Sequence, residues 1–240
     1  MKELIKKVLK KLPVAITQNQ KYDSQTTKVI SRVCSAGSSC IDIGAHKGEV
    51  LDIMLKYAPN GTHYAFEPIP DMYKNLVTKY KGMGNCKIYD YALSNNTGTA
   101  SFNYVISNPS YSGLVKRKYD RDNEEDTKIE VKTELLDNVL PGGYMPNFMK
   151  IDVEGGELLV LEGAKKTISS AKPVIIFEHG LGASECYGST PEKVYELLTS
   201  CGLVVSTMHR WLNNKPQFTE KDFCDHYYKK LDYYFIAYPL

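Results

Sequence analysis

The sequence predicts an α/β fold in which seven mostly parallel strands form one sheet with helices on both faces. Short apolar runs alternate with amphipathic segments along most of the chain, which is typical of a doubly wound sheet. The segment 173–177 is apolar throughout, as expected of a central strand that is covered on both sides. The run 40–43 ends at Gly44, and an amphipathic helix follows Gly48, so this stretch resembles the strand–loop–helix opening of a nucleotide-binding unit.

The remaining elements follow from the same periodicities. Helices expected at 2–12 and 24–35 precede the sheet, so we expect an N-terminal helical extension over 1–36 and a main domain over 37–240. Sheet strands are expected at 40–43, 63–66, 87–89, 148–152, 173–177, 203–206 and 233–238, with helices at 48–58, 70–81, 156–169 and 191–200. Segments 101–106 and 128–132 alternate as exposed strands do. The stretch 107–126 between these two strands is polar and aperiodic, as expected of an insert or lid.

Composition limits the functional classes. A net charge of +2 argues against a nucleic-acid partner, and no apolar run approaches the roughly 20 residues that span a bilayer. The six cysteines are scattered and never form C-x-x-C, which disfavours a zinc ribbon and suggests a reducing, cytoplasmic location. Residues 1–12 combine five lysines with an apolar stripe. Such a helix either packs on the domain or contacts a membrane surface or a partner.

The glycine loop 44–48 narrows the choice of ligand. His46 stands where the dinucleotide fingerprint requires its second glycine, which lets the backbone approach a pyrophosphate. The loop therefore favours a ligand that has an adenosine but no diphosphate, such as S-adenosylmethionine (SAM), over NAD. Glu67 lies 23 residues after Gly44, near the position of a ribose-binding acid, although a helix-capping or solvated glutamate before Pro68 is the alternative.

Other strand-end residues extend this candidate site. Asp42 either steadies the loop, meets the ammonium of a bound amino acid, or is a buried structural acid. Asp90, Tyr91 and Ala92 either flank an adenine ring or form a simple strand-end turn. The string 150–157 places Asp152 at the end of a strand, below the expected methyl donor, although acids that stabilise a helix N-terminus are the alternative.

Together these segments resemble the FkbM family of SAM-dependent methyltransferases. The resemblance rests on 41–48, 65–68, 91–94, 150–157, 161–164 and 173–178, and Lys-Ile-Asp-Val-Glu-Gly at 150–155 is its most specific part. It implies a Rossmann-like methyltransferase sheet, SAM as the donor, and usually a sugar or polyketide-type hydroxyl as the acceptor. The expected cofactor-binding residues are Asp42, Gly44, Ala45, His46, Glu67, Pro68, Asp90, Tyr91, Ala92 and Asp152.

Methylation of a hydroxyl requires a general base. His179 is the leading candidate because histidine titrates near neutral pH, and Asp152 and Glu154 come next. The alternative for His179 is a strand-end histidine bonded to backbone. Asp152, Glu154, Glu178 and His179 also offer oxygen and imidazole ligands for one divalent metal ion, so metal dependence is open.

Acceptor recognition is expected in the insert. Tyr111, Ser112, Arg117 and Tyr119 offer hydroxyls, aromatic faces and a cation, which suit a sugar, a phosphate or a carboxylate, although a solvated charged loop is the alternative. The sequence thus predicts a SAM-dependent O-methyltransferase for a sugar, glycan or similar small molecule. A non-catalytic SAM-binding scaffold is the alternative, His46 disfavours an NAD-dependent oxidoreductase, and the low net charge disfavours an RNA methyltransferase.

Overall fold

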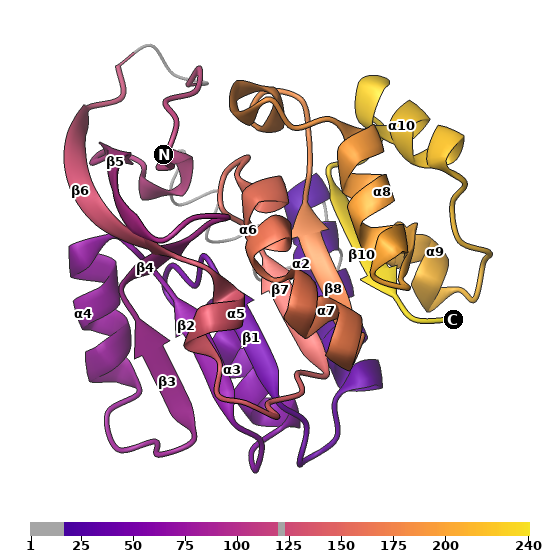
Figure 1. The fold of residues 1–240 in the computed structure, drawn as a ribbon, viewed down its shortest axis with the longest axis horizontal. Coiled ribbons are helices and arrows are strands. Elements are labelled where there is room, and N and C mark those ends of the chain that lie inside the picture. The colour runs from indigo at the N-terminus through magenta and orange to yellow at the C-terminus, as the bar shows by residue number, and fades with distance from the viewer. Residues whose placement is uncertain (1–16, 120–122) are drawn as a thin grey trace.

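The computed structural model describes residues 17–119 and 123–240 (Figure 1). The expected helix at 2–12 lies outside these residues. Whether it packs on the domain or contacts a membrane surface or a partner therefore stays a prediction. Within them, seven strands form one sheet in the order β3-β2-β1-β7-β8-β10-β9, and only β10 runs antiparallel to its neighbours. The strands are β1 Cys40–Ile43, β2 His63–Phe66, β3 Cys86–Tyr89, β7 Phe148–Ile151, β8 Val174–Glu178, β9 Val204–Ser206 and β10 Tyr234–Tyr238. The predicted α/β sheet is confirmed.

Helices cover both faces of this sheet. In Figure 1, α5, α6, α7 and α8 lie in front of the strands, and α2 and α3 lie behind them. The helices are α2 Gln18–Val33, α3 Glu49–Tyr57, α4 Pro70–Lys79, α5 Leu136–Val139, α6 Glu157–Gly163, α7 Lys165–Ala171, α8 Pro191–Ser200, α9 Met208–Leu212 and α10 Glu220–Tyr228. No described helix is both long and apolar enough to span a membrane.

Strand alternation divides the core between the two faces, since successive side chains of a strand point to opposite sides. Ile41 and Ile43 of β1 pack in the cluster beneath α6, α7, α8 and α10. Cys40 packs in the other cluster, with Val29 of α2 and Leu51 of α3. The polar residues of β1, β7 and β8 with even numbers, Asp42, Lys150 and Glu178, therefore face α2 and α3. The same alternation determines which acidic side chains lie close together at the strand ends.

A second sheet of three strands stands beside the strand ends of the main sheet. Its order is β4-β6-β5, with β4 Tyr91–Leu93, β5 Gly98–Val105 and β6 Asp126–Glu134. The strand expected at 101–106 overlaps the C-terminal part of β5, the strand expected at 128–132 lies within β6, and β5 and β6 pair antiparallel. The strand β4 was not expected. Between β5 and β6, the insert forms a short 3-10 helix, η1, at Pro109–Tyr111.

Two helix boundaries differ from the expectation for identifiable reasons. The helix α2 begins at Gln18 because Thr17 and Gln20 form a capping box, with N···O distances of 3.2 and 3.1 Å. The helix expected at 156–169 is divided at Ala164 into α6 and α7. Asp137 caps α7 by accepting from the backbone N–H groups of Lys166 and Thr167, both at 2.8 Å. The short helices α5, α9 and α10 were not expected.

Candidate active site

A cleft of about 1270 Å³ lies beyond the carboxyl ends of the strands, where open α/β sheets bind their ligands. Its walls come from the loop after β1, the end of β2, the loop after β7, the insert, α2 and the segment before β10. This volume exceeds the roughly 300–1,000 Å³ of ordinary small-molecule pockets, so the cleft has room for two ligands side by side.

The glycine loop is shaped by its close approach to the exit of β7. Gly44 has φ +75°, and a Cβ there would lie 1.9 Å from the carbonyl oxygen of Asp152. Glu67 holds the loop from the other side. Its Oε2 accepts from the N–H of His46 at 2.8 Å, and its Oε1 accepts from the N–H of Ile69 at 3.0 Å. Burial raises the pKa of this glutamate. Gly44, Ala45, His46, Glu67 and Pro68 all line the cleft.

The remaining expected cofactor residues separate into two groups. Tyr91 and Ala92, in β4, line the cleft. Asp42 and Asp90 are not among the lining residues. Asp42 is fully buried, and burial raises its pKa to about 6. Asp90 accepts at the surface from Lys132 at 3.3 Å, between side chains that are 40% and 65% exposed.

Lys150 joins the glycine loop to the acids. It stands opposite Asp42 in the register of β7 on β1, and its side chain is 9% exposed. Its Nζ lies 2.9 Å from the carbonyl oxygen of Gly44, 3.3 Å from Asp152 Oδ2 and 3.8 Å from Asp42 Oδ1. Lys150 opens the string 150–157 but was not among the expected site residues. A lysine inside an otherwise apolar central strand was the available signal, because such a cation requires a buried anionic partner.

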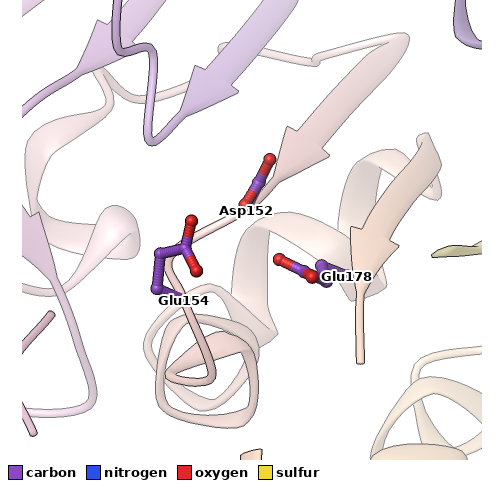
Figure 2. Close-up of side chains that lie close together, drawn as sticks. All are labelled: Asp152, Glu154 and Glu178. Atoms are coloured by element: carbon purple, nitrogen blue, oxygen red, sulfur yellow. The ribbon is translucent and has the colours of Figure 1, made fainter. Parts of the chain in front are cut away.

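Three carboxylates converge on the floor of the cleft. Asp152 follows β7, Glu154 lies in the next loop and Glu178 ends β8, and one oxygen of each lies within 4.8 Å of the others (Figure 2). Burial and the charge of Asp152 raise the pKa of Glu154 to about 8, and the same causes raise the pKa of Glu178 well above its usual value. Burial also disfavours the charge of Asp152, but Lys150 and Tyr234 outweigh it and lower the pKa of that group.

The loop that presents Glu154 is held by contacts on both sides. Glu154 has φ +60°, which is uncommon for a residue with a side chain. Glu157, at the start of α6, accepts from the N–H groups of Val153 at 3.0 Å and Gly155 at 3.2 Å. A Cβ on Gly155 would lie 2.6 Å from the backbone of Ala183. These contacts leave the Glu154 backbone little freedom, and its carboxylate points toward Asp152 and Glu178 in Figure 2.

His179 does not join this group, because strand alternation turns it to the opposite face from Glu178. It is fully buried, and its ring stacks on Tyr227 with centroids 4.7 Å apart. Neither ring nitrogen has a hydrogen-bond partner among the described residues, and burial lowers the pKa to about 4. His179 is also not among the residues that line the cleft. This placement does not favour a role for His179 as the general base or as a metal ligand.

The insert reaches the cleft through most of its expected residues. Tyr111, Ser112 and Arg117 line the cleft, whereas Tyr119 does not. Arg117 forms an ion pair with Glu154, and its guanidinium lies 4.2 Å from the centroid of the Tyr111 ring. Tyr119 instead steadies the insert, since its hydroxyl accepts from Asn103 Nδ2 at 2.7 Å.

Comparison with known proteins decides the family. Residues 42–205 match the model of the methyltransferase FkbM domain. The chain belongs to this family. The resemblance predicted from the sequence is therefore confirmed.

One related sequence and one related structure resemble this FkbM-family chain. Hexuronic acid methyltransferase AglP of Haloferax volcanii is 29% identical over 160 residues, which are 65% of this chain and 59% of that protein. Methyltransferase FkbM from Methylobacillus flagellatus KT superposes with a TM-score of 0.52 and 16% identity, covering 85% of this chain and 44% of that one. The second likeness concerns the fold alone. The matched segments span only 59% of the first protein and 44% of the second.

Two walls of the cleft lie outside the segment that matches the FkbM family. Helix α2 precedes residue 42, and strand β10 follows residue 205. Both contribute lining side chains, among them Tyr22 from α2 and Tyr234 from β10. Part of this site is therefore built by segments that the family model does not include.

Proposed function

We propose that this protein is a SAM-dependent O-methyltransferase that transfers a methyl group to a hydroxyl of a sugar, a glycan or a similar small molecule. One observation supports this most directly. A single cleft contains the glycine loop and Glu67 at one part of its wall, and Asp152, Glu154 and the insert at another. A donor and an acceptor bound in these two parts would meet at the strand ends.

The donor half fits the groups of SAM. Glu67 uses one lone pair of each oxygen for backbone N–H groups, and the remaining lone pairs can accept from two ribose hydroxyls. Tyr91 and Ala92 offer an aromatic and an apolar surface for an adenine ring. When bound, SAM supplies a methyl group that is already activated by a sulfonium.

The acceptor half requires alignment and a base. Good alignment of two reactants can lower a barrier by about 7–11 kcal/mol, so positioning is the main task of the protein. We assign the base to Glu154, because it lines the cleft and its pKa of about 8 lies near neutral pH. Asp152, which Lys150 and Tyr234 keep ionised, would orient the acceptor by accepting from a hydroxyl next to the one that Glu154 deprotonates.

The insert and a relative both support an acidic sugar as the acceptor. AglP is named for a hexuronic acid, a sugar that has several hydroxyls and one carboxylate. In this chain, Arg117 lies at the cleft wall against Tyr111 and Glu154, and N–H groups that its ion pair with Glu154 does not use can donate to a carboxylate. Glycans that contain uronic acids are therefore the first acceptors to test.

We propose that the reaction does not need a metal ion. The three clustered carboxylates are of a type that binds divalent ions. However, the cations of Lys150 and Arg117 already lie against Asp152 and Glu154. Methyl transfer should continue after treatment with EDTA, and activity that returns only when Mg²⁺ or Mn²⁺ is added back would contradict this.

The test combines binding with transfer. Calorimetry with SAM and NAD separates a methyltransferase from an oxidoreductase, and a protein that does not bind SAM would contradict the proposal. Transfer of a labelled methyl group is then measured on uronic-acid glycans, neutral glycans and RNA. A scaffold would bind SAM, and its Glu154→Gln variant would leave modification in cells unchanged.

A further inference from the structure

We propose that Tyr234 is a positioning residue that orients the carboxylate of Asp152, and that Tyr22 of α2 holds Tyr234 in place. The inference rests on the proposed function, because Asp152 matters to catalysis only if an acceptor binds beside it. It assigns a role to two residues that lie outside the 42–205 segment of the family match.

Strand β10 contacts Asp152 through the side chain of Tyr234. Tyr234 pairs with Glu178 in the antiparallel register of β10 on β8, so both side chains point to the face that also bears Asp152. The hydroxyl of Tyr234 donates to Asp152 Oδ2. Lys150 Nζ lies 3.3 Å from the same oxygen. Two donors on one oxygen fix the plane of the carboxylate.

Helix α2 contacts β10 and the residues before it through the side chain of Tyr22. Tyr22 is 5% exposed, and its ring centroid lies 5.1 Å from that of Tyr234 and 4.9 Å from that of Tyr233. Its hydroxyl donates to Asp232 Oδ1 at 3.0 Å and accepts from the N–H of Tyr233 at 3.4 Å. Tyr22 is thus tied to the chain directly before Tyr234, and its ring packs against the Tyr234 ring.

The two neighbouring tyrosines provide a matched pair. Tyr233 and Tyr234 are adjacent, and both rings contact Tyr22. Only their hydroxyls differ in partner, because the Tyr233 hydroxyl donates to Asn19 of α2 whereas the Tyr234 hydroxyl donates to Asp152. Replacement of either tyrosine by phenylalanine removes one hydroxyl and keeps the ring. A difference between the variants therefore reports the contact with Asp152 and not the packing.

The experiment compares Tyr234→Phe with Tyr233→Phe. Hydrogen bonds to charged groups are among the stronger ones, so we expect Tyr234→Phe to lower kcat about tenfold while the KM for SAM changes less than about twofold. Tyr233→Phe should remain within about twofold of the wild type, since its hydroxyl donates to Asn19 and not to Asp152. Tyr22→Phe should lower kcat by a smaller factor than Tyr234→Phe.

A second readout does not depend on methyl transfer. In protein labelled at the aspartate carboxyl carbons, with Asp152→Asn used for assignment, the Asp152 resonance should shift in Tyr234→Phe and not in Tyr233→Phe. An unchanged resonance in Tyr234→Phe would overturn the inference, and so would wild-type kcat in that variant. A wild type that methylates no acceptor, with the resonance shift present, would refute the proposed function and leave the contact established.

Discussion

Asp42 and Lys150 face each other on the adjacent strands β1 and β7, with 3.8 Å between Oδ1 and Nζ, and both side chains are buried. The same ammonium reaches the carbonyl oxygen of Gly44 and Oδ2 of Asp152. One cation thus lies between an acid below the glycine loop and an acid at the floor of the cleft. The glycine loop 44–48 and the string 150–157 are thus joined by the first residue of that string, a lysine that was not among the expected site residues.

Lys150→Met tests this connection. Removal of one partner from a buried ion pair leaves an uncompensated charge, so we expect the free energy of unfolding to fall by about 3–5 kcal/mol. Lys132→Met is the control, because Lys132 and Asp90 form an exposed pair, and a loss below about 1 kcal/mol is expected there. Urea unfolding measures both. Equal losses in the two variants would argue against a central role for Lys150.

Glu67→Ala should weaken SAM binding by more than about tenfold, because it removes the acceptor for two loop N–H groups and for the proposed ribose hydroxyls. Asp90→Ala is the matched control. Asp90 was an expected cofactor residue, but it lies outside the cleft lining, so its variant should retain the wild-type affinity. Calorimetry with SAM measures both affinities. An unchanged SAM affinity in Glu67→Ala, or a large loss of affinity in Asp90→Ala, would contradict the proposal that Glu67 and not Asp90 binds SAM.

Glu154→Gln should lower kcat by about 100-fold or more, since general bases typically contribute factors of 10²–10⁴. His179→Phe keeps a ring against Tyr227 and should remain within about threefold of the wild-type rate, because His179 does not line the cleft. Rates are measured with saturating SAM and the best acceptor. A large loss in His179→Phe with a stable fold would restore the histidine as the candidate base.

His179 also predicts a pH dependence of stability. Burial lowers its pKa from 6.5 to about 4, so between these values the unfolded chain binds a proton that the folded chain does not. The stability that this group contributes is present above pH 6.5 and is lost as the pH falls toward 4, by up to about 3 kcal/mol.

The measurement compares unfolding free energies at pH 7 and pH 4.5 in the wild type and in His179→Phe. The variant should lose less stability than the wild type on acidification, because it has no imidazole to charge. Parallel losses in the two proteins would show that other groups dominate acid denaturation.

Much of the fold was predictable because its signals are local. The strands at 40–43 and 63–66 and the helix at 191–200 have the expected bounds, since apolar runs, glycines and a proline mark them in the chain. The division at Ala164 was not predictable. A Cβ on Gly163 would lie 2.0 Å from the carbonyl oxygen of Ser94, so this end of α6 is set by a distant strand end.

The sequence by itself determined the family, the sheet and the presence of acids at successive strand ends, because each depends on short motifs and on strand periodicity. Only the tertiary structure decided which acids meet. Glu178 and His179 are neighbours in the chain, yet alternation sends one toward Asp152 and the other under α10. Tyr234 reaches Asp152 because β10 pairs antiparallel with β8, and strand order is a property of the whole chain.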